Sequence, residues 1–402
     1  MDSPAVPTTA TGNAIEPREV LTLARRDKRA AEEMLTGLSL EHQVALVCEA
    51  PAAQRARLLE LLSEPEAAIP LLPDAELVFT IKAAGLDDSS WLLEHATSRQ
   101  LATCFDLDAW NGLEPDREQL SHWFAVLAEA GEETLVRAAQ ALDPETLVLY
   151  LRDRVHVMLD PKDEEWQAPE GAQTLEGQFY FVARAEGDDI APILQLLHGL
   201  FRADYWLYFR MLQAVMWELE TELEEWALRW RTGRIEDLGF PPWEDAMRIY
   251  GFLRPELRAV LPERASQPAA TEWDFPVWIP DLPALALHDH LLFRAAFELD
   301  EAGRRSFFYG FVALANKVAV ADRLSLGDVE TLPIAIEKGA QIVSRGLEHV
   351  AAETATPASE VLERASLEYL FRVGASLDPD TARPEWLTRV QQDDAGSDEE
   401  EG

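Results

Sequence analysis

Short amphipathic runs, each opened by a small polar or proline-containing turn, dominate the first third of the sequence. The openings of this kind are LSLE at 38–41, LPDA at 72–75, ATSR at 96–99 and LDPE at 142–145. Apolar residues then recur at spacings of three and four, which is typical of a helix with one buried face. Because a short helix can bury that face only against a neighbour, we expect an α-solenoid-like stack of short helices over residues 17–153.

Two residue pairs in this region have the spacing of a capping box, in which side chains at a helix start bond to the exposed backbone N–H groups. These pairs are Thr97 with Gln100 and Ser63 with Glu66. Each pair predicts a helix start. The spacing from one start to the next is irregular, so the sequence predicts stacked helices without a strict repeat.

The periodicity changes after Asp153. The segments VHVML at 155–159 and FYFV at 179–182 are compact β-branched and aromatic runs bounded by Asp, Pro and Gly, as strands are. We expect them to pair as one small β-hairpin, within an insertion that spans residues 154–186. The polar segment between them, 160–177, is either a solvated loop or a functional one.

Residues 187–265 return to a helical pattern and are the predicted central helical region. From Ile190 to Arg231 the apolar residues recur at spacings of three and four, which predicts one aromatic and apolar face. The residues of this face are Trp206, Phe209, Gln213, Met216, Leu219, Leu223, Trp226 and Trp230. Gly233 fits the position just after a helix end, and Pro241 with Pro242 fits the next helix start.

The remaining segments complete a mainly α fold. Residues 1–16 are a predicted disordered leader, and residues 390–402 a predicted disordered acidic tail. Prolines interrupt residues 266–283, which predicts a Pro- and Trp-rich connector. Residues 284–389 predict a C-terminal helical bundle, with helices over 284–321, 329–350 and 359–376. We therefore predict stacked short helices, one small β-hairpin and a C-terminal helical bundle.

A formal net charge of −38 accompanies a hydrophobic content of 48%. The chain can thus bury a large core beneath a strongly negative surface, which repels nucleic acid and anionic membranes. Charged residues interrupt every apolar stretch long enough to span a membrane, and the first residues do not resemble a secretory signal. Cys48 and Cys104 lack neighbouring cysteines, so we predict that they are free thiols. The sequence predicts a soluble, cytoplasmic protein.

The densest group of arginines lies in the segment ELEEWALRWRTGRIEDLGF at 222–240. Its candidate anion or partner site consists of Arg229, Arg231, Arg234, Asp237, Trp226 and Trp230. Guanidinium groups beside aromatic rings suit planar anions. We favour the alternative, an internal lattice in which carboxylates pin the helix end to the next segment. The nearby carboxylates for this lattice are Glu224, Glu225, Glu236 and Asp237.

His288 and His290, on either side of Asp289, form the one close histidine pair. On a strand or turn such a pair can bind a metal ion, but on a helix the two rings diverge by about 200°. We therefore predict no metal site. The sequence also lacks the glycine-rich phosphate loops and nucleophile motifs of common enzymes, so it predicts no cofactor.

Two segments resemble a bacterial family of acidic, mostly helical proteins that carries only a domain-of-unknown-function label. They are LLPDAELVFTIKAAGLDDSSWLLEHATSRQLATCFDLDAWNG at 71–112 and EEWALRWRTGRIEDLGF at 224–240. The resemblance extends from about residue 17 to 390 and implies no activity. The N-terminal helix openings are also weakly similar to the helical N domain of magnesium transporters and to flagellar motor-switch proteins. That second resemblance implies binding of partners or divalent ions through acidic faces.

The sequence supports three main functional hypotheses and a fourth, minor one. Stacked amphipathic helices without a catalytic motif favour an interaction or scaffold protein whose partner is another protein. A divalent-cation-responsive acidic regulatory module is the first alternative, because Mg2+ and Ca2+ prefer carboxylate oxygens. The second alternative is an enzyme of unrecognised type that acts on a small anionic substrate at the arginine cluster. Mimicry of nucleic acid by the acidic surface is a further hypothesis.

Overall fold

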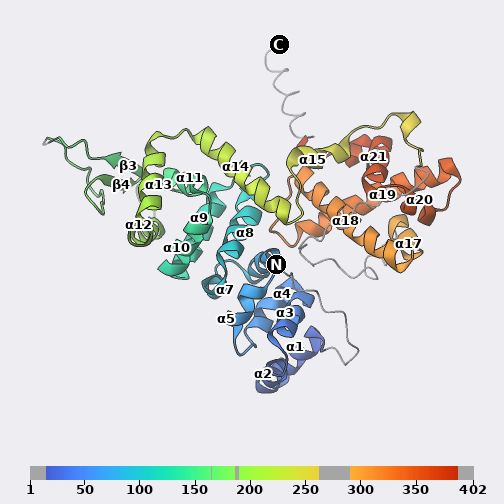
Figure 1. Cartoon of the computed structure of the whole chain (residues 1–402), viewed down its shortest axis with the longest axis horizontal. Helices are drawn as coiled ribbons and strands as arrows, with labels where there is room; N and C mark the ends of the chain where they lie inside the picture. Colours follow the sequence, from blue (N-terminus) through green and yellow to red (C-terminus); the bar gives the residue numbers. More distant parts are fainter. Residues whose placement is uncertain (1–14, 164, 186–189, 262–289, 388–402) are drawn as a thin grey trace, which may run out of the picture. The chain divides into compact units, whose positions relative to one another are not determined.

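The computed structural model describes residues 15–163, 165–185, 190–261 and 290–387 (Figure 1). The described chain is mainly α, as the sequence predicts. It divides into two compact units between Leu72 and Pro73, which is inside the predicted 17–153 domain. Residues 1–14 of the predicted leader, the 266–283 connector, the acidic tail, His288 and Asp289 lie outside the described residues.

The first unit is a small helical cluster with its own apolar core. Its elements are α1 (Pro17–Arg26), α2 (Lys28–Thr36), α3 (Leu40–Glu49), α4 (Ala52–Leu59), α5 (Pro65–Ala68) and the 3-10 turn η1 (Ile69–Leu71). Asp27 and Ser39 cap α2 and α3 by accepting hydrogen bonds from backbone N–H groups. The capping box predicted at Ser63 and Glu66 is wrong, because the residue before α5 is Glu64 and no side chain caps this helix.

The second unit begins with helices that pack in two alternating rows. Its first helices are α6 (Asp74–Ala84), α7 (Ser90–His95), α8 (Ser98–Asp108), α9 (Arg117–Glu129), α10 (Glu132–Ala141) and α11 (Pro144–Arg154). Helices α6, α8 and α10 contact one another in turn, as do α7, α9 and α11. This confirms the predicted stack of short helices. The capping box at Thr97 and Gln100 is also confirmed.

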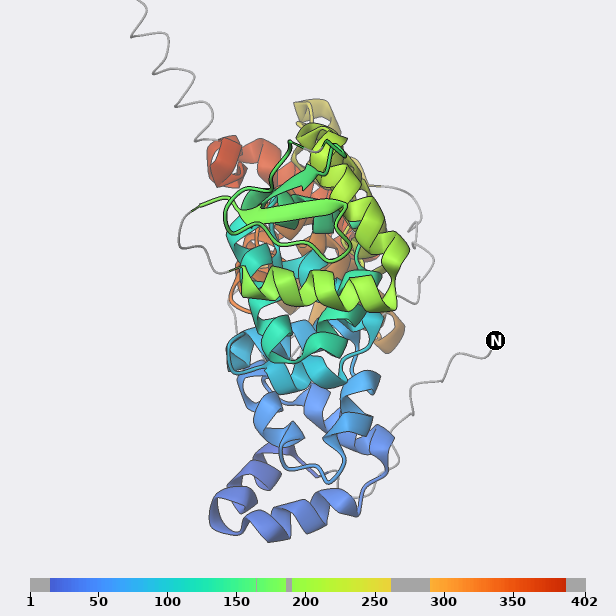
Figure 2. The ribbon, with the colours of Figure 1, turned by 90° about the vertical axis from the view of Figure 1, so that its left-hand side faces the viewer.

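Two short antiparallel sheets interrupt the helices. Strands β3 (Val155–Leu159) and β4 (Phe179–Ala183) form the predicted hairpin, with Val157 opposite Phe181. Strand β3 comes directly after α11 and also contacts α13 (Tyr205–Trp217), beside which it lies in Figure 2. The pair β1 (Trp110–Asn111) and β2 (Glu114–Pro115) was not predicted, because two residues are too few to show a strand pattern.

The helical run predicted from 190 to 231 consists of three helices, so its single aromatic face does not form. The helices are α12 (Ala191–Ala203), α13 and α14 (Glu220–Asp237). Asp204 caps α13 by accepting a hydrogen bond from the backbone of Leu207, which ends the preceding helix.

Helix α14 also runs through Gly233, where the sequence predicted a helix end. The helix ends at Asp237, and Gly239, two residues further on, adopts a positive φ of 86° that favours glycine. The N–H of Phe240 bonds to Ile235 O at 3.0 Å and that of Gly239 to Glu236 O at 2.9 Å, the Schellman pattern of a helix C-terminus.

The rest of the second unit consists of the end of the predicted central helical region, up to residue 261, and the predicted C-terminal helical bundle, from residue 290 onward. Its elements are α15 (Trp243–Met247), η2 (Arg248–Tyr250), η3 (Pro255–Leu257), α17 (Leu291–Phe297), α18 (Glu301–Ala321), α19 (Thr331–Thr354), α20 (Ala358–Arg364), α21 (Leu367–Leu377) and α22 (Pro379–Ala382). Helix α19 packs against α17, α18, α20 and α21. Asp300 and Ser366 cap new helices, so the predicted helices over 284–321 and 359–376 are each divided.

Two glycines set the crossing of α19 and α21. A Cβ atom added at Gly346 would overlap the carbonyl oxygen of Leu370, and one added at Gly374 would overlap that of Ile342. The two helices therefore touch backbone to backbone, which side chains would prevent. No helix among the described residues is long and apolar enough to cross a membrane.

Candidate functional site

The arginine cluster of α14 separates into an inward and an outward set, because consecutive helical residues point about 100° apart. Arg231 points inward and is 5% exposed. Its Nε donates to Asp106 O at 2.7 Å and its Nη1 to Gly112 O at 3.3 Å, while the guanidinium lies 4.8 Å from the Trp110 ring centroid. Burial lowers the pKa of Arg231 to about 10, which leaves the group charged at neutral pH.

Arg234 bridges two buried carboxylates. Its Nε and Nη2 donate to the two oxygens of Asp106, both at 2.7 Å, and Nη2 also donates to Asp143 Oδ1 at 2.7 Å. Burial alone would lower the pKa of Arg234, but the hydrogen bonds and charges of both carboxylates outweigh it and raise the pKa above its ordinary value. Because Asp143 also caps α11, Arg234 fastens α14 to the end of α8 and the start of α11.

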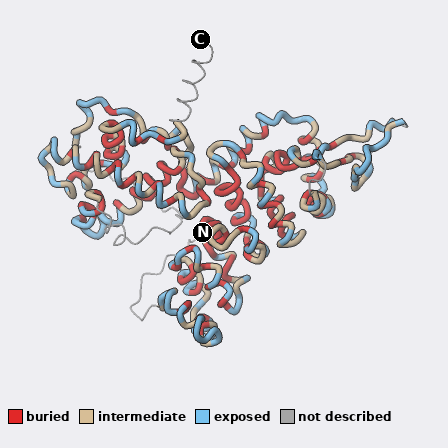
Figure 3. The backbone as a smooth tube through the Cα atoms, turned by 180° about the vertical axis from the view of Figure 1, so that it is seen from behind, coloured by how far each residue is buried: buried red, intermediate tan, exposed pale blue. Residues whose placement is uncertain are grey.

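The buried network continues beyond Asp106 along α8. Asp108 forms an ion pair with Lys82 at 2.8 Å and accepts hydrogen bonds from Gln119 Nε2 at 2.6 Å and Trp123 Nε1 at 2.9 Å. Figure 3 shows the α8 segment as buried along most of its length. The acids of this helix are therefore internal acceptors that hold the neighbouring helices around α8.

The cavity beside Arg231 is too small for a substrate. It measures about 30 Å3, which is room for only one or two water molecules, and is lined by residues that include Gly112, Trp243 and Arg323. Arg231 and Arg234 thus act as an internal lattice, the alternative favoured from the sequence. The carboxylates predicted for it were wrong, because Glu224 bonds instead to Arg117 at 2.6 Å and the lattice acids come from α8 and the cap of α11.

The outward set of α14 forms an apolar surface, which we call the tryptophan stripe: Leu219, Trp226 and Trp230. Their spacings of seven and four residues place them along one side of the helix. They are 62%, 44% and 49% exposed, and the rings of Trp226 and Trp230 stack with centroids 6.1 Å apart. Most soluble proteins bury such residues, so an exposed row of this kind is a candidate interaction surface.

Carboxylates surround the tryptophan stripe. Glu222 and Glu225 make no ion pair with any residue that the structure describes, and Asp237 is exposed at the helix end. Arg229 lies over Trp226, with its guanidinium carbon 5.0 Å from the ring centroid. The ring face of Trp226 can therefore hold a guanidinium in an otherwise acidic setting.

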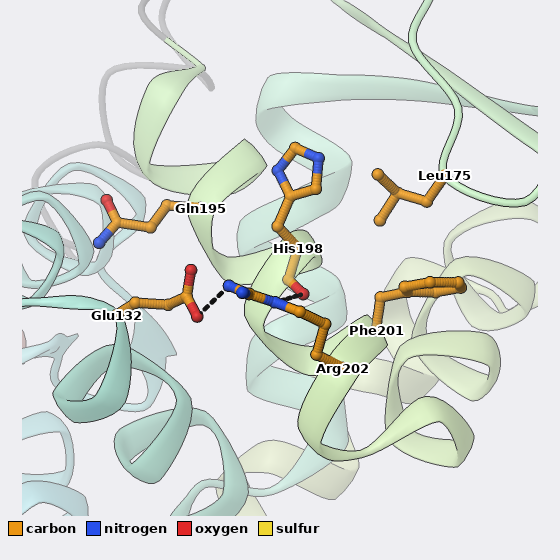
Figure 4. A pocket seen from close by; sticks show the side chains of 6 residues that line it. All are labelled: Glu132, Leu175, Gln195, His198, Phe201 and Arg202. Atoms are coloured by element: carbon orange, nitrogen blue, oxygen red, sulfur yellow. Dashed lines mark hydrogen bonds and ion pairs between the residues drawn. The ribbon is translucent and has the colours of Figure 1, made fainter.

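An open pocket of about 690 Å3 lies between α10, α12 and the segment before β4 (Figure 4). Glu132 and Arg202 form an ion pair across it, and Gln195 Nε2 donates to Ala128 O at 3.2 Å. The His198 ring points into the open space. Because most of the polar groups already have protein partners, this pocket offers few groups for a ligand.

Metal-binding groups are missing from the part of the chain that the structure describes: no three His, Cys, Asp or Glu side chains come close enough to hold an ion. His290, the described member of the histidine pair, directly precedes α17, and its Nε2 lies 2.9 Å from Glu337 Oε1.

The two segments that carry the family resemblance meet in this network. Asp106, Trp110 and Gly112 come from the first segment, whereas Arg231 and Arg234 come from the second. Over residues 32–380 the chain matches a family described as "Family of unknown function (DUF6178)". The chain belongs to this family. No curated protein and no solved structure matches the chain, and nothing supports the similarity to magnesium transporters or flagellar motor-switch proteins. The match to DUF6178 includes both segments.

Sequence reasoning missed the partners of the arginines. Asp106 and Asp143 lie 128 and 91 residues before Arg234, and nothing in their local sequence indicates burial. One signal was present: Asp143 belongs to the opening LDPE, so it was recognisable as a helix cap whose second oxygen remains available. The exposure of Trp226 and Trp230 had no such signal, because helical spacing alone cannot distinguish a buried face from a binding face.

Proposed function

We propose that this protein is a cytoplasmic interaction module that binds a basic segment of a partner protein on the tryptophan stripe. The observation that carries the proposal is an exposed Trp226–Trp230 stack bordered by carboxylates that lack ion-pair partners among the described residues. Tryptophan supplies the largest apolar contact area of any side chain, and aromatic residues dominate the energy of protein interfaces. Cys104 is a buried free thiol, as is usual in a reducing compartment.

The chemistry of the stripe fits lysine and arginine side chains. A cation over an indole ring gains about 0.5–2 kcal/mol, and the surrounding carboxylates add attraction. The net charge of −38 also increases the encounter rate with a basic partner. Arg229 already occupies one ring face, so a partner cation either joins it on the second ring or displaces it.

The inward side of α14 keeps this surface rigid. Arg231 and Arg234, one and four residues after Trp230, fasten the helix to α8 and α11. A surface held in its binding conformation loses little conformational entropy on association, which strengthens binding.

Photocrosslinking from Gly233 tests the proposal. An added Cβ at this position meets no atom within 4 Å, so p-benzoylphenylalanine can be placed there beside Trp230. In lysate of the native organism we expect a stoichiometric crosslink to one protein, through a peptide rich in Lys and Arg. The same photoreactive residue at Phe252, which is 64% exposed and also carries an arginine over its ring, is the matched control and gives no such product.

Variants then identify the groups responsible. Trp226→Ala with Trp230→Ala removes the crosslink, because central aromatic residues contribute about 2 kcal/mol or more each to an interface. Glu222→Lys with Glu225→Lys weakens it by charge repulsion, whereas Phe252→Ala leaves it unchanged. An acidic or neutral crosslinked peptide, or equal yields from both positions, contradicts the proposal.

No observation favours the other hypotheses to the same degree. A divalent-cation response remains a prediction from composition, since the described residues offer no group of three or more metal ligands. An enzyme acting at the arginine cluster lacks a substrate-sized space there, because the adjoining cavity has room for only about one or two water molecules.

A further inference from the structure

A second pocket, of about 540 Å3, lies where the hairpin meets α13, and we call it the hairpin groove. Its lining residues come from the end of α11, strand β3, the segment after it, the residue after β4, and α13. They are Arg152, His156, Val157, Met158, Leu159, Pro161, Trp166, Arg184, Val215 and Met216. Its size is that of sites that bind small organic molecules.

The charge of the hairpin groove is opposite to that of the chain. The whole sequence has 73 Asp and Glu against 35 Lys and Arg. Among the described residues, the groove lining has two arginines and one histidine but no Asp or Glu. A local reversal of sign in so acidic a protein indicates a site that favours an anion.

The two arginines keep donors available for a ligand. Arg152 donates from Nη1 to Glu218 O at the end of α13, which orients its guanidinium. Arg184 donates from Nε to Val155 O at 3.4 Å. Neither forms an ion pair with a residue that the structure describes. Asp153 interacts electrostatically with Arg184, but its hydrogen-bond donor is Arg117, at 3.1 Å. Each guanidinium has five N–H donors, so most remain free for a planar anion.

The rest of the lining is apolar. Met158 and Leu159 from β3 and Val215 and Met216 from α13 line the groove together with Trp166. The Trp166 ring packs edge to face on Tyr180 of β4, with centroids 5.0 Å apart, which holds it beside the strands. Methionine side chains adapt to apolar ligands of different shapes.

We propose that the hairpin groove binds a small organic carboxylate with an apolar chain. The carboxylate lies between Arg152 and Arg184, and the chain lies against Trp166 and the methionines. This site is separate from the tryptophan stripe, and the proposal does not depend on the function proposed above.

Calorimetric titration of the full chain with octanoate tests the proposal. We expect one site per chain with a dissociation constant below about 1 mM. Octanol, which has the same chain without the charge, binds at least about tenfold more weakly. Arg184→Gln and Arg152→Gln each weaken octanoate binding about tenfold, the effect of one lost charge-assisted hydrogen bond. Arg184 is exposed, so its variant keeps the fold even if Arg152→Gln does not.

Two controls separate this site from general adsorption. Arg202→Gln removes an exposed arginine from the other pocket and leaves octanoate binding within about twofold of the wild type. Trp166→Ala weakens octanoate and octanol alike, because it removes apolar contact only. The proposal is overturned if octanoate does not bind at about 10 mM, or if Arg184→Gln and Arg202→Gln have equal effects.

Discussion

The two sides of α14 contrast in a way that composition would not suggest. Its inward side carries Arg231 and Arg234, whereas its outward side carries Trp226 and Trp230. Burying guanidinium groups is unfavourable unless each finds hydrogen-bond acceptors, and here carbonyls and two aspartates supply them. Indole rings exposed to water do not contribute the free energy of apolar burial, so their exposure does not stabilise the fold. The difference teaches that the inward side serves the structure, whereas the exposed rings of the outward side do not, which is why we propose that side as the binding surface.

The largest test of this contrast removes the bridging arginine. Arg234→Met leaves Asp106 and Asp143 buried without their shared partner, so we expect a loss of about 3–5 kcal/mol in the free energy of unfolding, measured in urea. The outward control, Arg229→Met, changes stability by less than about 0.5 kcal/mol. Equal losses of stability from the two substitutions would contradict the distinction between the inward and outward sides of α14.

A substitution at Arg231, with a smaller expected effect on stability, distinguishes the contribution of the guanidinium's shape from that of its charge. Arg231→Lys keeps a positive charge but has no planar fork to reach both Asp106 O and Gly112 O while lying over Trp110. We expect a loss of about 1–3 kcal/mol, because one buried carbonyl loses its donor. Urea unfolding measures it, and a lysine variant as stable as the wild type would show that charge alone is enough.

The smallest predicted effect is a gain. Gly233 lies inside α14 with open space around it, so Gly233→Ala should stabilise the chain by about 0.5–1 kcal/mol through helix propensity. Thermal unfolding monitored by circular dichroism measures this gain. Gly199→Ala is the packed counterpart: its Cβ would overlap the Val136 side chain on α10, so it should destabilise. Stabilisation by both would mean that α12 does not pack on α10 as described.

Much of the fold could be predicted from local patterns. Thr97 with Gln100 indicated a helix start, and the runs at 155–159 and 179–182 indicated the hairpin, because capping and strand patterns are properties of adjacent residues. Helix ends were harder to predict. Gly233 has the local sequence of a helix end, but α14 continues through it to Asp237, and the glycine that follows the helix with a positive φ is Gly239.

The candidate site was predictable only in part. Its arginines were visible as a cluster, and their internal role was predicted from the acidity of the chain. Their partners Asp106 and Asp143 were not, because long-range pairing leaves no local trace. The hairpin groove was hidden for the same reason: Arg152 and Arg184 are about 30 residues apart in the chain, and only strand pairing brings the start of β3 and the end of β4 together.

The glycine contact between α19 and α21 makes this bundle vulnerable at a single point. Since no methyl group fits at Gly346 or Gly374, the separation of the two helices is set by their main chains and cannot be adjusted by repacking. One alanine there acts as a wedge. It would separate α19 from α21 and leave the residues of the tryptophan stripe and of the hairpin groove unchanged. Binding measurements on such a variant would therefore show whether either surface depends on the C-terminal bundle.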